Sequence, residues 1–306
     1  MFDLVAIGNP VYDEIITPYI STNGRVLSGC STNAALVAKK LGVNRVGLIG
    51  CVGLDYHERF IKDIRRFGVE DLQVLKSDNT GGFKLVYLEN GDRTLQVLGV
   101  AGKILFETLS NKTVEALRNS KFILLGPILN EIDLDFIKAV KRISKAKIFL
   151  DPQGLIRRVG SDGMVEKVFN IDTVREIIGV VDIVKPNEFE AEAISGLKDP
   201  FKSARLFMEW CGGKVAIVTL GDRGSIIAFK DGVFRIPPYQ TFARDPTGAG
   251  DSYAGAFITQ LLKGASLLEA AYFASAASSI MVEYTGPEFD MTLSEVQRRL
   301  NIIKRL

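Results

Sequence analysis

The sequence predicts an α/β fold in which a mostly parallel sheet is covered by helices on both faces. Short apolar runs recur along the 306 residues without polar alternation, which is typical of strands buried on both faces. Segments with helical apolar spacing lie between these runs. The composition, 47% hydrophobic and 24% charged, supplies enough apolar material for the core of one large domain.

The apolar runs give the expected strands, and the periodic segments between them give the helices. We expect strands at residues 4–7, 46–49, 122–125, 147–150, 182–184 and 215–218. Phe60, Ile61, Ile64 and Phe67 form one helical stripe, and Leu134, Ile137, Val140 and Ile143 form another. A strand followed by a helix, repeated in this way, predicts a layered sandwich with right-handed crossovers.

Two segments, residues 11–28 and 72–98, have strand patterns without helices between them. Asn90-Gly91 in the second segment favours a tight hairpin turn. We expect both segments to form a small β flap outside the main sheet. The alternative is an ordinary surface hairpin.

The charge balance and the single histidine exclude several classes of function. Lysine and arginine number 38 against 36 acids, and a net charge of +2 gives no basic field for a nucleic acid. One histidine, His57, rules out multi-histidine zinc sites and leaves a Ser-His-Asp triad dependent on that residue alone. We therefore expect neither a nucleic-acid partner nor a hydrolase.

The cysteines and the apolar segments indicate the compartment. Three scattered cysteines, Cys30, Cys51 and Cys211, suit reduced thiols better than a disulfide framework. The start of the chain lacks the basic residues and long apolar stretch of a signal peptide. No stretch approaches the roughly 18 apolar residues that cross a membrane. We expect a cytoplasmic protein without a membrane partner.

Asp245-Pro246-Thr247-Gly248-Ala249-Gly250-Asp251, followed by a helical run from 252 to 262, is the densest functional signal. Gly248 and Gly250 allow close approach of the backbone to a ligand, and a helix that starts here directs free N–H groups at an anion. Asp251 would repel a bound phosphate, so its place suits a proton acceptor for a substrate hydroxyl. The alternative is a glycine-rich turn with an acid in the first helical turn.

This heptapeptide resembles the D-T-x-G-A-G-D signature of the ribokinase-like, or PfkB-type, carbohydrate kinases, with Pro246 as a departure. The resemblance implies a ribokinase-like three-layer sandwich with a small β lid, and an ATP-dependent phosphotransferase that acts on an alcohol. It also implies that Asp251 is the catalytic base and that the amides of Gly248, Ala249 and Gly250 form an anion hole. The Gly-x4-Gly-Lys-Ser/Thr phosphate loop does not occur.

Asn187-Glu188-Phe189-Glu190, with Lys185 just before it, resembles the N-x-x-E motif of that family. The resemblance implies that Asn187 and Glu190 place Mg²⁺ through water and, with Lys185, bind the nucleotide phosphates. Oxygen ligands plus water are what Mg²⁺ prefers. The alternative is a helix N-cap followed by first-turn acids.

Thr219-Leu220-Gly221-Asp222-Arg223-Gly224 resembles the family's T-x-G-x-x-G nucleotide loop. The resemblance implies that Thr219, Gly221 and Gly224 contact the nucleotide, and the alternative is a plain hairpin turn. The family resemblance also allows a monovalent cation such as K⁺ beside Asp245 and Thr247, which the sequence does not establish.

The acceptor site is expected in the first half of the chain. Residues 8–13 resemble the end of the family's opening strand, which implies that Asn9 and Asp13 bind substrate hydroxyls. Residues 28–35 resemble G-G-x-x-x-N-x-A, with serine in place of the first glycine, which implies contacts from Gly29 and Asn33. Carboxylate and amide groups can pair both ends of a hydroxyl. The alternatives are a turn carboxylate and a helix cap.

Asp151-Pro152-Gln153-Gly154 stands where the family has D-x-N-x-R, so the roles of Gln153 and Arg157 follow less directly. We expect both near the acceptor, and Arg157 near the acceptor or the phosphates.

The sequence therefore predicts a kinase that transfers phosphate from ATP to a hydroxyl of a small sugar or polyol, with inositol-like acceptors included. A nucleoside acceptor is the alternative within the family. From another class, a non-catalytic sugar- or nucleotide-binding regulatory module is disfavoured by Asp251. A nicotinamide-dependent oxidoreductase is disfavoured because the glycine fingerprint is missing after the first strand. We expect the flap to close over the acceptor and to pair two chains into a homodimer.

Overall fold

A computed structural model describes residues 1–88 and 93–305. Among these residues, nine strands form the main sheet in the order β15-β14-β13-β12-β9-β8-β1-β4-β5. The pairings from β13 to β5 are parallel, whereas β13–β14 and β14–β15 are antiparallel. The strands are β1 (Leu4–Ile7), β4 (Val46–Gly53), β5 (Glu70–Ser77), β8 (Phe122–Leu125), β9 (Lys147–Leu150), β12 (Ile183–Val184), β13 (Val215–Thr219), β14 (Ser225–Phe229) and β15 (Gly232–Ile236).

Both faces of this sheet are buried, as the lack of polar alternation in the strands predicts. In β1, Leu4 and Ala6 belong to one apolar cluster, while Val5 and Ile7 belong to the cluster on the opposite face. The α/β fold with a mostly parallel sheet is confirmed.

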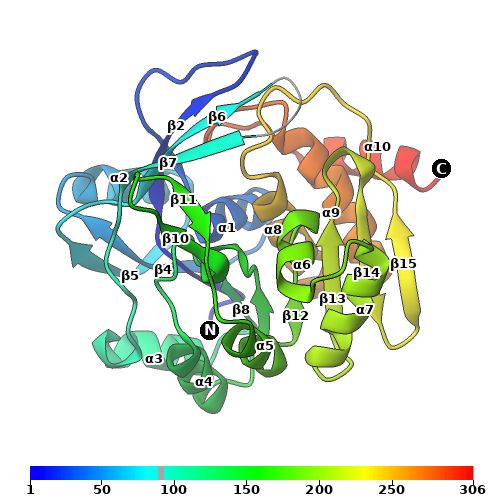
Figure 1. Ribbon diagram of the computed structural model, residues 1–306, viewed down its shortest axis with the longest axis horizontal. Coiled ribbons are helices and arrows are strands. Elements are labelled where there is room, and N and C mark those ends of the chain that lie inside the picture. The colour runs from blue at the N-terminus through cyan, green and yellow to red at the C-terminus, as the bar shows by residue number, and fades with distance from the viewer. Residues whose placement is uncertain (89–92, 306) are drawn as a thin grey trace.

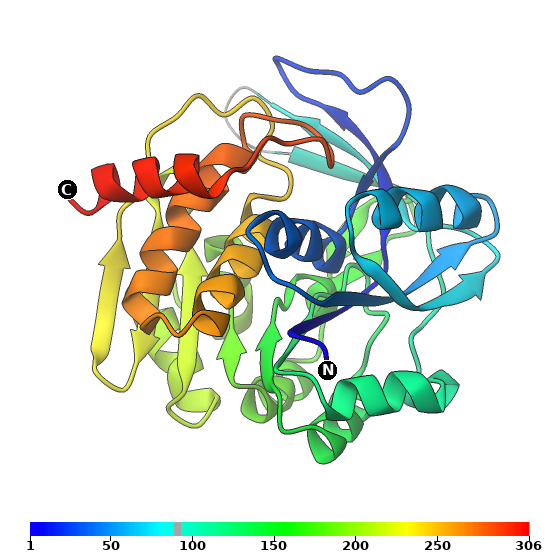
Figure 2. The ribbon, with the colours of Figure 1, turned by 180° about the vertical axis from the view of Figure 1, so that it is seen from behind.

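Helices cover the two faces in separate groups (Figures 1 and 2). One group packs into the first cluster: α1 (Cys30–Lys40), α2 (His57–Arg66), α8 (Ala249–Leu262), α9 (Leu267–Met281) and α10 (Leu293–Ile303). The other group packs into the second: α3 (Asn111–Arg118), α4 (Leu134–Ile143), α5 (Ile171–Val180), α6 (Glu188–Ser195) and α7 (Pro200–Trp210). Short 3₁₀ helices are η1 (Phe106–Thr108), η2 (Gln153–Ile156) and η3 (Gly221–Arg223). None of the helices in the described residues has the length and apolar character needed to cross a membrane.

Helices α1 and α8 pack unusually close together. A Cβ atom on Gly255 of α8 would lie only 2.4 Å from the carbonyl oxygen of Ala34 in α1. Real Cβ contacts are longer, so this crossing needs glycine at position 255. The two helices thereby bring their N-terminal ends to the same place.

A second, small sheet stands outside the sandwich, with the strand order β3-β2-β6-β7. Its strands are β2 (Val11–Ile16), β3 (Val26–Ser28), β6 (Gly82–Tyr87) and β7 (Arg93–Gly99). A compact apolar cluster that includes Val11, Ile15, Phe83 and Leu85 fills one face. We call these four strands the small sheet.

The segment 72–98, expected to lie wholly in the flap, is instead divided between the two sheets. Residues 72–77 belong to β5, which pairs in parallel with β4 at the edge of the main sheet. The physical reason is that Leu72 and Leu75 pack onto the main core, which gives this edge strand an apolar face. Asn90-Gly91, the expected turn, lies outside the described residues.

An additional hairpin, β10 (Arg157–Val159) with β11 (Val165–Lys167), was not expected from the sequence. Its turn contacts the small sheet, since the amide of Val97 in β7 donates to the carbonyl of Gly163 at 2.9 Å. The hairpin therefore connects the region after β9 to the small sheet.

Candidate active site

The predicted functional residues gather at the carboxyl ends of the parallel strands. Asn9 follows β1, Asp151 follows β9 and Lys185 follows β12, and these strands are close neighbours in the sheet. Ligands of open α/β sheets bind outside this edge.

Helix α8 begins at this edge with an uncapped N-terminus. Its N-cap is Gly248, in the left-handed conformation with φ 79°, and no side chain caps the helix. The amide of Ala249 donates to the carbonyl of Pro246 at 3.3 Å, while no side chain satisfies the other amides of the first turn. Those amides therefore remain available to an anion, with the positive end of the helix dipole behind them. A Cβ on Gly248 would lie 2.9 Å from Met281 Cε and 3.0 Å from Asn33 Nδ2, so both backbone and space require glycine.

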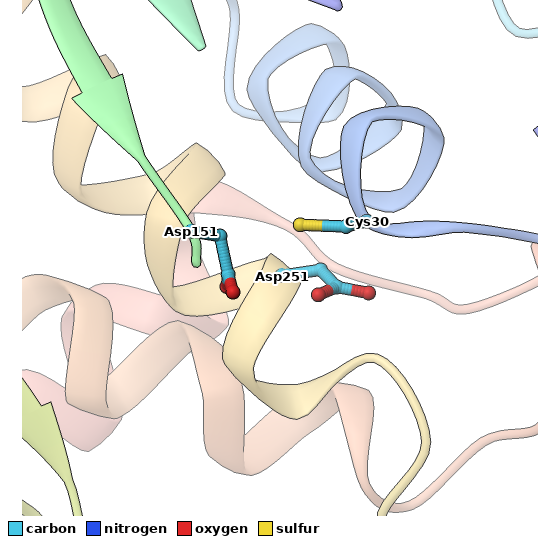
Figure 3. Close-up of side chains that lie close together, drawn as sticks. All are labelled: Cys30, Asp151 and Asp251. Atoms are coloured by element: carbon cyan, nitrogen blue, oxygen red, sulfur yellow. The ribbon is translucent and has the colours of Figure 1, made fainter. Parts of the chain in front are cut away.

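Asp251, in the first turn of α8, faces the start of α1. Its Oδ2 accepts a hydrogen bond of 2.9 Å from Nδ2 of Asn33. One ligand atom each from Cys30, Asp151 and Asp251 lie within 4.8 Å of one another, and Figure 3 shows these side chains converging from α1, the end of β9 and α8. Burial and the charge of Asp151 raise the pKa of Asp251, and the bond from Asn33 opposes this. A carboxylate with a raised pKa is a suitable general base.

Lys185 places a cation beside the start of α8. Its Nζ lies 2.8 Å from Asp151 Oδ2, and both side chains are almost fully buried. A Cβ on Gly250 would be 3.2 Å from this ammonium group. Burial lowers the pKa of Lys185, but the charge and hydrogen bond of Asp151, with the charges of Cys30 and Glu190, together raise it by more, so the ammonium stays charged. Lys185 and the backbone amides at the start of α8 therefore place positive charge on the same side of the site.

The N-x-x-E motif forms a capping box at the start of α6. Asn187 Oδ1 accepts from the amide of Glu190, and Glu190 Oε2 accepts from the amide of Asn187, both at 2.9 Å. The N-cap alternative therefore describes the local geometry. The other carboxylate oxygen of Glu190 lies 3.9 Å from Arg157, and burial followed by the charge of Asp151 raises the pKa of Glu190.

The T-x-G-x-x-G segment lies next to this helix start. The amide of Thr219, at the end of β13, donates to the carbonyl of Pro186 at 3.1 Å, and Arg223 pairs with Glu188. Gly221 and Gly224 both have positive φ, and a Cβ on Gly224 would lie 2.1 Å from the carbonyl oxygen of Ile236. The loop thus requires glycine at position 224 and is held beside the capping box.

Asp245 and Thr247 precede the start of α8. Oδ1 of Asp245 accepts from the amide of Thr247 at 2.9 Å. Oδ2 of Asp245 and the hydroxyl of Thr285 are buried, with no hydrogen-bond partner in the described part of the chain.

On the acceptor side, Gly29 is the N-cap of α1, with φ 113° and no side-chain cap. Asn33 follows in the first turns of this helix. Asp13 of β2 is buried and accepts from the amide of Phe83 at 2.8 Å. Burial raises the pKa of Asp13 to about 7, against the bond from Phe83. The starts of α1 and α8 and one strand of the small sheet therefore meet here.

Asn9 has a different position from the one expected for a hydroxyl ligand. Its Nδ2 donates to the carbonyl of Gly102 at 2.9 Å, and its Oδ1 accepts from the amide of Cys51 at 2.8 Å. The amide group thus joins backbone segments of the fold. Gln153 lies half-buried on η2, where its backbone amide donates to Asp151, and Arg157 begins β10.

Sequence reasoning did not assign two groups that the structure brings to the site, Asp151 and Cys30. Asp151 could have been found, because it directly follows a buried strand at the functional edge. Cys30 lies inside a recognised motif.

Comparison with known proteins adds a family to this geometry. The family model for pfkB family carbohydrate kinases matches residues 1–293. A cytidine kinase from Thermococcus kodakarensis is 30% identical over 278 residues, covering 88% of this chain and 92% of the relative.

Solved structures agree in fold. The Arabidopsis thaliana ribokinase complexed with ribose and ATP has a TM-score of 0.78 at 23% identity, covering 98% of this chain and 99% of that one. A pyrophosphate-dependent kinase of the ribokinase family, complexed with a pyrophosphate analogue and myo-inositol, has a TM-score of 0.78 at 20% identity, covering 96% and 99%. With the family match over nearly the whole length, the chain belongs to the pfkB family of carbohydrate kinases, which are phosphotransferases.

Proposed function

We propose that this protein transfers the terminal phosphate of ATP to a hydroxyl of a small sugar or polyol, with Asp251 as the catalytic base. The observation that supports this most is the placement of Asp251 in the uncapped first turn of α8, beside Asn33 and the buried ion pair of Lys185 with Asp151. A base, free helix amides and a fixed cation are the parts that in-line phosphoryl transfer needs.

In the proposed reaction, the acceptor oxygen forms a bond to the terminal phosphorus as the bond to the ADP oxygen breaks. Asp251 takes the hydroxyl proton, and Asn33 orients the carboxylate through its hydrogen bond. The amides of Gly248, Ala249 and Gly250, with Lys185, offset charge on the phosphoryl oxygens.

The residues present fit a magnesium ion held through water. Only one carboxylate oxygen of the buried Glu190 takes part in the capping box, and the other faces Arg157. We propose that Glu190 and Asn187 hold Mg²⁺ through water, where it would neutralise the nucleotide phosphates. The loop at Thr219, Gly221 and Gly224 is proposed to bind the nucleotide.

For the acceptor, we propose that Asp13, Asn33 and the start of α1 at Gly29 bind hydroxyl groups. Arg157 is proposed to help, because it lies 3.9 Å from Glu190 and its charge lowers the pKa of Asp13. Gln153 is proposed to contact the acceptor from η2. The inositol-bound structural neighbour supports inclusion of cyclic polyols among the acceptors tested.

A nucleoside is the second candidate acceptor. The relative at 30% identity is a cytidine kinase.

The acceptor is tested by measuring ADP release with a panel of sugars, inositols and nucleosides. A turnover with sugars or inositols at least about tenfold above that with every nucleoside supports the first candidate, and the reverse supports the second. Absence of ADP release with every member of the panel would contradict both.

A monovalent cation is proposed at Asp245. A buried carboxylate oxygen without a partner in the described residues is costly unless a cation or water meets it. Replacement of Na⁺ by K⁺ at constant ionic strength should raise turnover, and Asp245→Asn should remove that difference. Equal turnover in both salts would contradict the proposal.

We further propose that the small sheet closes over the acceptor to exclude water and pairs two chains as a homodimer. Tyr19 and Leu88 are exposed on its segments, which supports an apolar contact there. Protease cleavage within β6 and β7 of the small sheet should slow when acceptor and a nonhydrolysable ATP analogue are added. Equilibrium sedimentation should give twice the chain mass, and a single-chain mass would contradict pairing.

The compartment is proposed to be the cytoplasm. Cys30, Cys51 and Cys211 are free and buried, which is consistent with a reducing environment that also supplies ATP.

A further inference from the structure

Arg299, on α10, is a buried cation that the proposed reaction does not use. Helix α10 packs against α9, and only 7% of the Arg299 side chain is exposed (Figure 2). Its Nη2 donates to Oε2 of Glu283 at 3.0 Å, and its Nη1 lies 2.8 Å from Oε1 of the same carboxylate. A guanidinium group that meets both oxygens of one carboxylate fixes its direction as well as its distance.

Three further contacts hold the Arg299 side chain in place. Nη1 donates to Oγ of Ser279 in α9 at 3.1 Å, and Nε donates to Glu295, one turn earlier in α10, at 2.7 Å. The guanidinium group also lies 4.8 Å from the centre of the Tyr239 ring. Arg299 therefore joins α10, the end of α9 and the segment that contains Tyr239.

Glu283 connects Arg299 to the segment that leads into α8. It follows the end of α9, and its Oε1 accepts from the hydroxyl of Thr241. The carbonyl of Val282, the preceding residue, accepts from the amides of Arg244 and Asp245 at 2.8 and 3.0 Å. Two consecutive residues after α9 are therefore bonded to the segment before α8, one through its side chain and one through its backbone.

The two bonded segments also carry the buried polar atoms that have no hydrogen-bond partner in the described part of the chain. These atoms are Oδ2 of Asp245 and Oγ1 of Thr285. Because Val282 binds the amide of Asp245 and Thr285 follows three residues later, the spacing of the two oxygens depends on how the segments are held together. Residues that orient the ligands of a metal ion strengthen its binding without touching it.

We propose that Arg299 is a positioning residue for the monovalent-cation site at Asp245. This inference rests on the proposed function. Arg299 acts through Glu283, which holds the segment from Thr241 to Asp245 against the end of α9. Loss of the guanidinium group should let the oxygens of Asp245 and Thr285 move apart and thereby weaken the binding of K⁺.

The test measures K⁺ binding through its effect on the thermal unfolding of the full chain. KCl replaces NaCl at constant ionic strength, and the K⁺ concentration that gives half of the rise in the unfolding midpoint is determined. Arg299→Met should raise this concentration by about tenfold to a hundredfold, the range for loss of a residue that orients metal ligands. Arg299→Lys should recover part of the loss, because an ammonium group pairs with Glu283 but lacks the fork that meets both oxygens.

A double variant separates positioning from stability. Arg299→Met alone leaves the charge of Glu283 without its partner, which should lower the unfolding midpoint. Addition of Glu283→Gln removes that charge but keeps an acceptor for Thr241, so the midpoint should recover in part. The K⁺ concentration should stay raised, because the connection to α10 is still missing. Recovery of K⁺ binding together with stability would show that Arg299 acts on packing alone and would overturn the inference.

Arg298→Ala is the matched control. Arg298 is the neighbouring residue of α10 and also contacts Glu295 and Tyr239, but its side chain is half-exposed. The K⁺ concentration for this variant should equal that of the wild type. An effect as large as that of Arg299→Met would show that any change in α10 weakens K⁺ binding, which contradicts a specific role for Arg299.

Failure of this inference is distinguishable from failure of the proposed function. If K⁺ raises the unfolding midpoints of the wild type and of Arg299→Met at the same concentration, only the role of Arg299 is wrong. If the wild type unfolds at the same temperature in K⁺ and in Na⁺, the cation site is wrong as well. Phosphate transfer is tested independently of both by ADP release with the acceptor panel.

Discussion

Helices α8 and α6 both begin at the functional edge and both carry an acid three residues after the N-cap, yet the two acids do different things. In α6, Glu190 folds back onto its own helix start and exchanges hydrogen bonds with Asn187. In α8, the N-cap is Gly248, which has no side chain to exchange, and Asp251 faces Asn33 instead. A capped start satisfies its own amides, whereas an uncapped one leaves them for a ligand.

Helix α9 shows that the capped form is also used away from the site. Its Ser266 and Glu269 form the same reciprocal box as α6. Burial and Asp151 raise the pKa of Asp251, whereas bonds from Ser266 lower the pKa of Glu269. Glu269 therefore serves as a matched reference for both acids near the site.

The largest expected effect comes from Asp251→Asn. Turnover should fall by roughly 10²-fold or more, because the proton acceptor is lost, while ATP affinity stays within a few-fold. Asp172→Asn, which changes an exposed first-turn acid of α5, is the control and should keep wild-type turnover. Wild-type turnover in Asp251→Asn would show that the catalytic base is not Asp251 in the first turn of α8.

Gly248→Ala should be the next most harmful change. The left-handed backbone costs about 1–2 kcal/mol with a Cβ, and displacement of Asn33 should reduce turnover by at least about tenfold. Gly264→Ala is the control, since Gly264 also has positive φ but open space around its Cβ position. Thermal unfolding should show a loss in both variants, larger for Gly248→Ala because its Cβ also crowds Met281 and Asn33, and only Gly248→Ala should lose turnover. Equal turnover in both would contradict the claim that space at this start matters.

Glu190→Gln separates capping from magnesium binding. Glutamine can still accept from the amide of Asn187, so stability should change little, whereas loss of the charge should raise the Mg²⁺ concentration for half-maximal turnover by about tenfold. Glu269→Gln changes the box in α9 and should leave that concentration unchanged. An unchanged Mg²⁺ dependence in Glu190→Gln would limit this residue to capping.

The smallest effect should be on how the free energy of unfolding depends on pH, and it should have opposite signs for Asp251 and Glu269. The raised pKa of Asp251 favours the folded state below the pKa of the unfolded chain, and this contribution is lost as pH rises through the folded value. Asp251→Asn should therefore be more stable than the wild type at pH 8, with the advantage disappearing near pH 4.

Glu269→Gln should show the reverse trend. Because the pKa of Glu269 is lowered in the folded protein, the ionised carboxylate stabilises the fold at pH values above the pKa of the unfolded chain. The variant should therefore be less stable than the wild type at pH 8 and as stable as the wild type at low pH. Denaturant unfolding at both pH values measures each difference. The same sign for both variants would contradict the contrast.

The parts of the molecule that the sequence could predict are those with a local signature. Strands buried on both faces lack alternation, and Gly248 to Asp251 combine chemistry with a helix start, so both could be recognised. Residues 72–77 were misplaced because pairing with β4 depends on tertiary contacts that no local pattern records. The same is true of Asp151 with Lys185, which are 34 positions apart.

The close contact between Gly255 and Ala34 determines how accurately Asn33 and Asp251 are positioned relative to each other. Because α1 and α8 touch backbone to backbone, Asn33 and Asp251 are carried by one solid block rather than by two parts that adjust separately. Any side chain larger than hydrogen at position 255 would wedge this block apart. The resulting separation of the two helices would misalign Asp251 with the acceptor hydroxyl, while both substrates could still bind.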